Sequence, residues 1–225
     1  MREFNMEQGS DEWFAKKLGI LSASNFSKVC TTSGKPSSSA DAYIDELIQE
    51  RVTGKRIEGF VNDAMLRGAE LEPEARNHFS FMTDIKVREV GWCVHDDIQA
   101  GCSPDGLIVG SPNRMKRGEG LEIKCPLWKT HCGWLRKGKL PTQHKLQVQG
   151  SLFITGYERW HFYSYHPDFD EQLHIVVERD EKIITALEKY LIQAAKEIKL
   201  MTERLSYDNG IALIRDMRRE EDFNE

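Results

Sequence analysis

The chain has 225 residues, of which 40% are hydrophobic and 30% are charged, with a formal net charge of −5. This composition is ordinary for a globular protein with a buried core, and no apolar run approaches the ~18 residues of a membrane span, so a membrane protein is not expected. The polar N-terminus lacks the apolar core of a signal peptide, and the five cysteines show no CxxC spacing, which together predict a cytoplasmic protein with free thiols.

The charge is distributed unevenly along the sequence. Between residues 106 and 157, nine lysines and arginines stand against two acidic residues, a local net charge of +7 that leaves −12 for the rest of the chain. A concentrated basic segment is typical of a protein that meets an anionic partner, such as the phosphates of DNA, with one face only. A cluster of solvated basic residues in loops is the alternative interpretation.

In chain order, the first third of the sequence is expected to be helical. Ser10 is suited to cap a helix whose first turn carries Asp11 and Glu12, and Gly19 would end that helix. The further elements expected in this part are a helix start at 22–24, a polar loop over 31–40, a helix through 43–48 that closes at Gly54, and a helix over 62–81.

The middle of the sequence is predicted to form strands. Residues 121–125 alternate with period two, so Leu121, Ile123 and Cys125 share one face while Glu122 and Lys124 share the other. The other expected elements are strands at 85–94, 106–109, 160–165 and 173–177, a helix over 143–154 and a long amphipathic helix from Glu181. The pattern predicts an α+β fold in one domain spanning 1–225, with a central twisted mixed β-sheet flanked by helices.

Two segments carry a pattern typical of metal-dependent phosphodiester hydrolysis. A Pro-Asp-Gly turn places Asp105 beside the strand at 106–109, and the chain returns through 110–120 to bring Glu122 next to it. Two carboxylates and the carbonyl of Ile123 offer the hard oxygen ligands that Mg²⁺ prefers. Lys124 would orient water or stabilise charge, since it could act as a base only if its pKa were lowered.

An Asp followed at a distance by Glu-x-Lys is, taken alone, more often a structural ion-pair pattern than an active site. Here the Pro-Asp turn, the strand alternation and the basic surroundings favour the catalytic interpretation. These residues resemble the PD-(D/E)XK nuclease superfamily, and the whole chain resembles the phage-lambda-type exonucleases, also called YqaJ-like viral recombinases. The motifs that carry the resemblance are Gln8-Gly9-Ser10 with Trp13, Gly19, Ser22-Ala23-Ser24, Arg67-Gly68 with Glu72, and the segments 102–107, 121–126 and 147–149.

The resemblance implies the PD-(D/E)XK, or restriction-endonuclease-like, fold and a role for each matching residue. The expected metal ligands, for Mg²⁺ with Mn²⁺ as a substitute, are Asp105, Glu122, Glu72 and the carbonyl of Ile123. The expected catalytic residues are Asp105, Glu122, Lys124, Glu72 and Gln147. Contacts to DNA and to the 5′-phosphate of the digested end are expected from Lys17, Ser22, Ser24, Ser103, Lys137 and Lys139.

Two positions depart from the pattern of the family or leave alternatives open. Lys17 stands where the family usually has arginine, so the bidentate grip on phosphate is lost and the 5′-phosphate preference is expected to be weaker. Glu72 precedes Pro73, and a helix that starts at the proline would make Glu72 a terminal residue of it. A helix that runs through Pro73 would instead place Glu72 on an otherwise apolar stripe, where a carboxylate needs a metal or a partner.

The resemblance implies a processive Mg²⁺-dependent 5′→3′ exonuclease on double-stranded DNA, which releases mononucleotides and leaves 3′ single-stranded tails for phage-type homologous recombination. It further implies a ring-shaped homotrimer on DNA ends, a phage-type single-strand annealing protein as partner, and the cytoplasm of a bacterial host that carries a phage or prophage. The alternatives are a structure- or sequence-specific DNA endonuclease on the same core and a catalytically idle DNA-binding recombination module.

Overall fold

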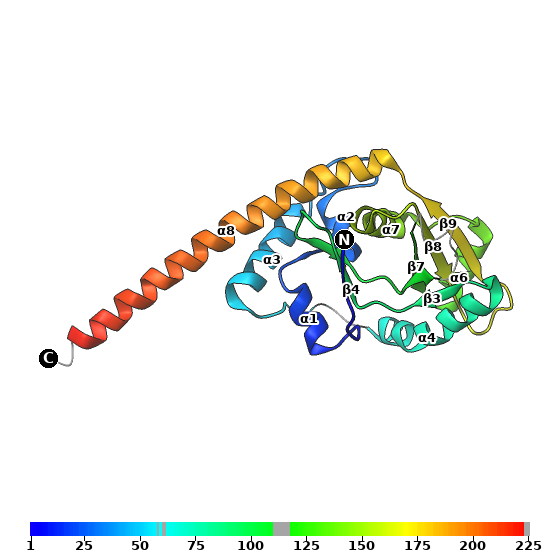
Figure 1. Cartoon of the computed structure of the whole chain (residues 1–225), viewed down its shortest axis with the longest axis horizontal. Coiled ribbons are helices and arrows are strands. Elements are labelled where there is room, and N and C mark those ends of the chain that lie inside the picture. The colour runs from blue at the N-terminus through cyan, green and yellow to red at the C-terminus, as the bar shows by residue number, and fades with distance from the viewer. Residues whose placement is uncertain (58, 60–61, 110–117, 223–225) are drawn as a thin grey trace.

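The computed structural model describes residues 1–57, 59, 62–109 and 118–222. Within them, helices pack on both faces of a five-stranded sheet, and a second, four-stranded sheet lies beside it. The last helix begins on the body and extends well beyond it (Figure 1). None of the described helices is long and apolar enough to cross a membrane.

The helices have the following bounds: α1 (Asp11–Lys17), the 3₁₀ helix η1 (Ala23–Asn25), α2 (Phe26–Val29), α3 (Ala40–Thr53), α4 (Asp63–Thr83), α6 (Trp128–Lys137), α7 (Thr142–Thr155) and α8 (Glu181–Asp222). The strands are β1 (Arg2–Phe4), β2 (Leu21–Ser22), β3 (Lys86–Arg88), β4 (Trp92–Val94), β5 (Ala100–Cys102), β6 (Gly106–Val109), β7 (Glu119–Lys124), β8 (Arg159–Ser164) and β9 (Leu173–Glu178).

The five-stranded sheet has the strand order β3-β6-β7-β8-β9 and is mixed, because β7 and β8 run parallel while the other pairs are antiparallel. Its parallel pair is joined through α6 and α7, as a parallel connection requires a long crossover. The predicted α+β class, with a central mixed sheet flanked by helices, is confirmed. The expected strands at 106–109, 121–125, 160–165 and 173–177 all lie in this sheet.

The four-stranded sheet, with the order β1-β4-β5-β2, was not expected from the sequence. The predicted single strand over 85–94 is wrong in this respect: β3 joins the five-stranded sheet and β4 joins the four-stranded one. The break falls at Gly91, where a Cβ atom would come within 2.3 Å of the carbonyl oxygen of Met6. The close approach of the N-terminal segment there separates two strands that look continuous in sequence.

The apolar core lies on both faces of the five-stranded sheet. On one face, Trp160 and Phe162 of β8 join a large cluster with α3, α7 and α8. On the other face, Phe79 of α4 packs with Leu121 and Tyr163 in a smaller cluster. The alternation along β7 is therefore real, since its apolar residues pack beneath α4 and Glu122 points to the opposite side, where Gln147 of α7 reaches it.

The helix boundaries in the N-terminal half follow the expected capping chemistry. The Ser10 side chain accepts a hydrogen bond from the backbone N–H of Trp13, and Gly54 ends α3 in the left-handed conformation. The helix α4 runs through Pro73 without ending, which decides between the two interpretations of Glu72 and places this carboxylate in the middle of the helix.

The helix α6 was not expected, and it brings the predicted DNA contacts Lys137 and Lys139 to its C-terminal end. The structure places Lys137 in the last turn and ends the helix at Gly138, which adopts the left-handed conformation. The sequence hides this helix because its fully buried residue is polar, His131, and because Gly133 lies at its centre.

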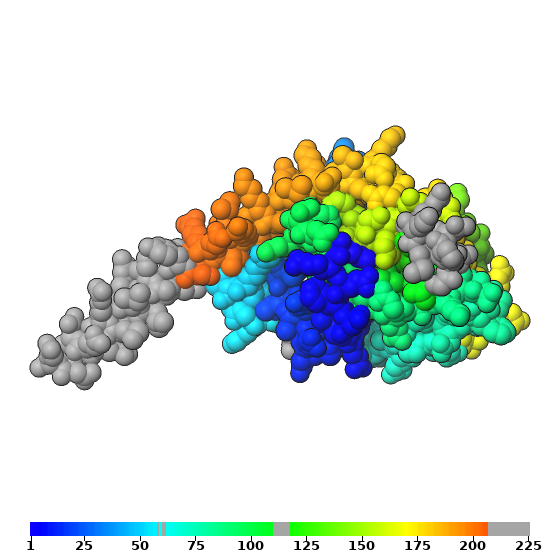
Figure 2. Space-filling view, in the orientation of Figure 1, coloured from blue at the N-terminus to red at the C-terminus, as the bar shows by residue number. Residues whose placement is uncertain are grey.

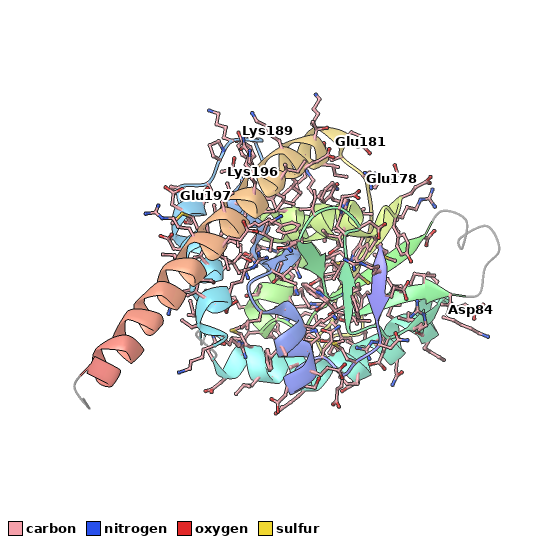
Figure 3. The ribbon with its side chains drawn as sticks, turned by 60° about the vertical axis from the view of Figure 1, so that its left-hand side comes forward. Asp84, Glu178, Glu181, Lys189, Lys196 and Glu197 are labelled. Atoms are coloured by element: carbon pink, nitrogen blue, oxygen red, sulfur yellow. The ribbon has the colours of Figure 1, made fainter. Side chains whose placement is uncertain are left out.

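The surface of the body brings distant segments together. Figure 2 shows the N-terminal segment at the centre of the visible face, between the surfaces of α3 and α4. Figure 3 shows charged side chains along the outer side of α8, among them Glu181, Lys189, Lys196 and Glu197. The opposite side of α8 packs on α3 and α7, as the amphipathic pattern predicts.

Candidate active site

The candidate site lies where β6 begins and β7 ends. In the antiparallel pair, Gly106 is opposite Leu121, so Asp105 stands directly beside the end of β7. The backbone N–H of Asp105 donates to the carbonyl of Leu121 at 3.1 Å, and the backbone N–H of Ile123 donates to Asp105 Oδ2 at 2.5 Å. The Pro-Asp-Gly turn therefore points the Asp105 side chain across the hairpin toward Ile123, which lies between Glu122 and Lys124 in β7.

The predicted Glu-x-Lys pair forms a direct contact on the α7 side of the sheet. The Lys124 ammonium donates to Glu122 Oε1, and the side-chain amide of Gln147 donates to the same oxygen at 2.5 Å. Glu122 is 2% exposed, while Lys124 keeps part of its side chain accessible. The structure thus brings Glu122, Lys124 and Gln147 together, as the sequence analysis expected.

The helix α4 supplies the third carboxylate, which is the expected Glu72, and also Arg76, which the sequence did not predict as a site residue. Arg76 Nη2 donates to Glu72 Oε1 at 2.6 Å, and Arg76 Nε donates to the backbone carbonyl of Asp105 at 2.7 Å. A further nitrogen of the same guanidinium lies 3.1 Å from Glu89. The i,i+4 spacing of Glu72 and Arg76 was the available signal, but the contact to Asp105 depends on the fold.

The Gln8 side chain explains why an N-terminal motif accompanies the site. Its amide donates to the carbonyl of Val90 at 3.0 Å and to the carbonyl of Pro104 at 2.8 Å. Gln8 therefore ties the N-terminal segment to the turn that carries Asp105. This is a structural role at the edge of the site.

Burial and the repulsion between neighbouring carboxylates raise the pKa values of the carboxyl groups of the site. Burial, with the charge of Asp105, raises the pKa of Glu72 to about 7 against the attraction of Arg76. Burial also raises the pKa of Glu122 to about 7, with Lys124 opposing and Asp105 adding to the shift. The pKa of Asp105 is raised by burial as well, although Lys124 and the N–H of Ile123 oppose this.

The pKa of Lys124 is raised, and this opposes a role of Lys124 as a base. Burial alone would lower the pKa of its ammonium, but Glu122 and Asp105 outweigh burial and raise the pKa above its ordinary value. A lysine with a raised pKa stays protonated, so it can orient a group or stabilise negative charge.

The donor set fits a hard divalent cation. Glu72, Asp105 and Glu122 are desolvated and repel one another, and a bound cation would offset that repulsion. Within the described residues, no group of three or more His, Cys, Asp or Glu side chains is arranged so that it could hold a metal ion as a complete protein cage, so the cation would be held by fewer of these carboxylates at once. Mg²⁺ needs no such cage, because it is usually held by one or two carboxylates and keeps several waters.

Two cavities meet at this cluster. One, of about 670 Å³, lies between the N-terminal segment and α4, and the other, of about 430 Å³, lies between α4 and the end of β7. Glu72 and Asp105 line both of them, while Ile123 and Lys124 line the smaller one. Glu72 and Asp105 are therefore reachable from these cavities, whereas Glu122 lines neither and is 2% exposed.

The residues expected to bind a 5′-phosphate gather in a third cavity, of about 500 Å³. Lys17, Ser22 and Ser24 line it, and the two serine hydroxyls lie 3.0 Å apart. The Lys17 ammonium lies 3.4 Å from the centre of the Trp13 ring. Burial, followed by the charge of Arg56, lowers the pKa of Lys17 to about 7.

The remaining predicted DNA contacts are placed differently. Ser103 does not line the third cavity, but its hydroxyl accepts a hydrogen bond at 3.0 Å from the Trp13 indole, which does. Lys137 and Lys139 are exposed at the end of α6 and line none of the three cavities. Part of the predicted basic segment, 110–117, lies outside the described residues.

Comparison with known proteins is consistent with the geometry of the site. The sequence profile described as the YqaJ-like viral recombinase domain matches residues 12–158. A comparison with curated proteins gave no match.

Among solved structures, the chain is similar to an alkaline exonuclease from Laribacter hongkongensis, with 32% sequence identity and a TM-score of 0.78 over 90% of this chain and 100% of that one. The same exonuclease in complex with dAMP gives a TM-score of 0.77 at the same identity and coverage. A phage-related exonuclease from Haemophilus somnus, with 16% identity and a TM-score of 0.61 over 82% of this chain and 96% of that one, shares the fold.

Proposed function

This chain belongs to the YqaJ-like viral recombinase family and has the PD-(D/E)XK nuclease fold of its lambda-type exonucleases, and from this membership we propose that it is a Mg²⁺-dependent 5′→3′ exonuclease on double-stranded DNA. The observation that carries the proposal is the buried cluster of Asp105, Glu122 and Lys124 at the end of β7, with Glu72 beside it. Repeated cleavage at the receding 5′ end releases mononucleotides and leaves 3′ single-stranded tails for homologous recombination.

The residues of the cluster divide the chemistry among them. Asp105, Glu122, Glu72 and the carbonyl of Ile123 would hold Mg²⁺, or Mn²⁺ in its place. When bound, the cation supplies a Lewis acid for the phosphoryl oxygen and lowers the pKa of a water.

Lys124, held protonated by Glu122 and Asp105, stabilises the negative charge that develops on the phosphoryl group. Gln147 fixes the position of Glu122 through its amide hydrogen bond.

Support for the 5′ polarity comes from the third cavity. The cavity is lined by an ammonium group and two hydroxyls, groups that can bind a terminal phosphate, and the hydrogen bond from Trp13 to Ser103 links it to the segment that carries Asp105. A phosphate anchored there would present the neighbouring phosphodiester bond to the carboxylates, so digestion would start from the 5′ end.

The experiment is digestion of linear duplex DNA, labelled at the 5′ or the 3′ end, with Mg²⁺ and with EDTA. We expect early release of the 5′ label with Mg²⁺ and no release with EDTA. The Lys124→Ala variant should bind ends but cut at least about 100-fold more slowly, since charge stabilisation is lost. Release of the 3′ label first would refute the polarity, and undiminished cutting by the variant would remove Lys124 from the mechanism.

Circular duplex DNA separates the alternative functions. An exonuclease leaves a closed circle intact, whereas an endonuclease on the same core cuts it. A catalytically idle DNA-binding module would digest neither the circle nor the linear duplex.

The assembly proposed with this activity is a ring-shaped homotrimer on DNA ends, with a phage-type single-strand annealing protein as partner in the cytoplasm of a bacterial host that carries a phage or prophage. The uneven charge supports a ring, because the basic segment between residues 106 and 157 could line a channel while the acidic remainder of a chain of net charge −5 faces outward. Light scattering should give about 78 kDa, three times the chain mass of 25.9 kDa. A value near 25.9 kDa at micromolar concentration would refute the trimer.

A further inference from the structure

The third cavity contains two cations at close quarters, although the sequence analysis expected only Lys17 there. Arg56 follows α3 and also lines the cavity, together with residues of α1 and with Ser22 and Ser24. Its guanidinium carbon lies 3.9 Å from the centre of the Phe14 ring. The segment is held at the cavity by the backbone N–H of Ile57, which donates to Glu50 Oε1 at 3.1 Å.

The other charges that line the cavity are engaged. Lys28 pairs with Glu46 at 3.2 Å. The second carboxylate oxygen of Glu50 accepts from the backbone N–H of Gly19 at 2.8 Å, so both of its oxygens are used. Within the described part of the chain, Lys17 and Arg56 have no carboxylate within ion-pair distance, and each rests instead on an aromatic ring. Two cations without a carboxylate partner in one cavity repel each other, and a bound anion would offset this repulsion.

The two cations differ in what they can offer that anion. The Lys17 ammonium is packed against Trp13 and Trp92, with ring centres at 3.4 and 5.1 Å. Burial and the nearby charge of Arg56 lower the pKa of Lys17 to about 7, and only Cys102 opposes the shift. An arginine keeps its charge under the same conditions and presents a planar fork that matches two phosphate oxygens.

We infer that Arg56 is the specificity-determining residue for the 5′-terminal phosphate in this chain, supplying from the end of α3 the guanidinium that α1 lacks at Lys17. The inference rests on the proposed function. It reverses the expectation of a weak 5′-phosphate preference, because the fork is present but comes from a different element. Phe14 orients the guanidinium, and Lys17 and Ser24 complete the cavity around the anion.

The test compares initial digestion rates on blunt duplexes that differ only in a 5′-phosphate or a 5′-hydroxyl. The wild-type protein should prefer the phosphorylated end. Arg56→Ala should reduce that preference about tenfold, the scale of one lost charge-assisted hydrogen bond, and Arg56→Lys should restore only part of it. Lys55→Ala is the matched control, since Lys55 is the exposed neighbour and does not line the cavity.

A second readout does not depend on turnover. Fluorescence anisotropy in EDTA should show that wild-type protein binds the phosphorylated end more tightly than the hydroxyl end, and that Arg56→Ala binds the two equally. Circular dichroism should confirm that the variant is folded.

The failures are distinguishable. A wild-type protein that digests neither duplex would overturn the proposed function. A wild-type protein that digests both, with a phosphate preference that Arg56→Ala leaves unchanged in rate and in binding, would overturn the role of Arg56. A preference lost only in Lys17→Met would overturn it as well.

Discussion

At the scale of single residues, the candidate site depends on Arg76 as much as on the carboxylates. One guanidinium joins the Glu72 side chain, the backbone of Asp105 and the exposed Glu89. It thereby fixes the distance between α4 and the turn before β6. A group that orients proposed metal ligands in this way is expected to matter for metal affinity although it touches no metal.

We therefore expect Arg76→Ala to raise the Mg²⁺ concentration for half-maximal digestion roughly 10- to 100-fold, the usual effect of removing a partner of a metal ligand. Arg88→Ala is the control, because Arg88 lines the same cavity but pairs with Glu3 at 2.7 Å. Titration of activity with Mg²⁺ and calorimetric measurement of binding check the prediction. Equal Mg²⁺ requirements for the two variants would contradict it.

The raised pKa values of Glu72 and Glu122 make stability depend on pH and on metal together. Both pKa values move from 4.5 to about 7 on folding, so these groups favour the folded state below pH 4.5 and cease to do so as the pH rises through 7. Above pH 7 two buried carboxylates are charged, and a bound cation offsets the cost.

Mg²⁺ should therefore raise the melting temperature more at pH 8 than at pH 6. The measurement is thermal unfolding in EDTA and in Mg²⁺ at both values. Glu122→Gln should reduce the difference, because the glutamine carries no charge to be offset. An equal Mg²⁺ shift at the two pH values would show that these carboxylates do not bind the cation.

At the scale of elements, the packing of β7 against its parallel neighbour β8 requires a residue without a side chain at Gly120. A Cβ on Gly120 would lie 2.4 Å from ring carbons of Trp160, which is fully buried in β8. Gly133 in α6 is the opposite case, since a Cβ there would meet nothing within 4 Å.

Gly120→Ala should destabilise the protein by about 1–3 kcal/mol through overpacking, and should lower activity because β7 carries Glu122 and Lys124. Gly133→Ala should stabilise it by about 0.5–1 kcal/mol, since alanine is the better helix former. Urea unfolding of both variants tests the pair. A neutral Gly120→Ala would mean that Trp160 moves aside at little cost.

The elements that were predicted correctly are those with a local periodicity in the sequence. The period-two alternation of β7 and the 3.6-residue periodicity of α8 are local, and both predictions are confirmed. The three-residue strands β1, β4 and β5 are too short to show a period, and β1 pairs with a strand about 90 residues away, with Glu3 opposite Cys93 of β4. For the same reason the strand predicted over 85–94 proved to be two strands in two sheets.

At the scale of the whole molecule, the first half of α8 closes the core. Leu187 and Leu191 are fully buried in the large apolar cluster, and α8 contacts α2, α3 and α7. The helix therefore holds α2 and α3, from the N-terminal part of the chain, against α7. Leu200 lies further along the same helix and is 55% exposed.

Leu187→Ala should cost about 2–5 kcal/mol of unfolding free energy, because it leaves a cavity in the core. Leu200→Ala, the same substitution on the same helix, should stay within about 0.5 kcal/mol of wild type. Chemical denaturation measures both. Similar losses in the two variants would indicate that the exposed side of α8 is covered in solution, as an oligomer would cover it.

The sequence by itself determined the α+β class, the resemblance to the family, and the association of Asp105 with Glu122 and Lys124. These follow from local chemistry: a turn that aims one carboxylate, and an alternation that aligns a glutamate with a lysine. Only the tertiary structure decided that α4 continues through Pro73, that Arg76 reaches Asp105 and that Arg56 lines the third cavity. Their partners are distant in sequence, as with Arg76 and Asp105, 29 residues apart, and such contacts depend on how helices pack against the sheets, which no local periodicity encodes.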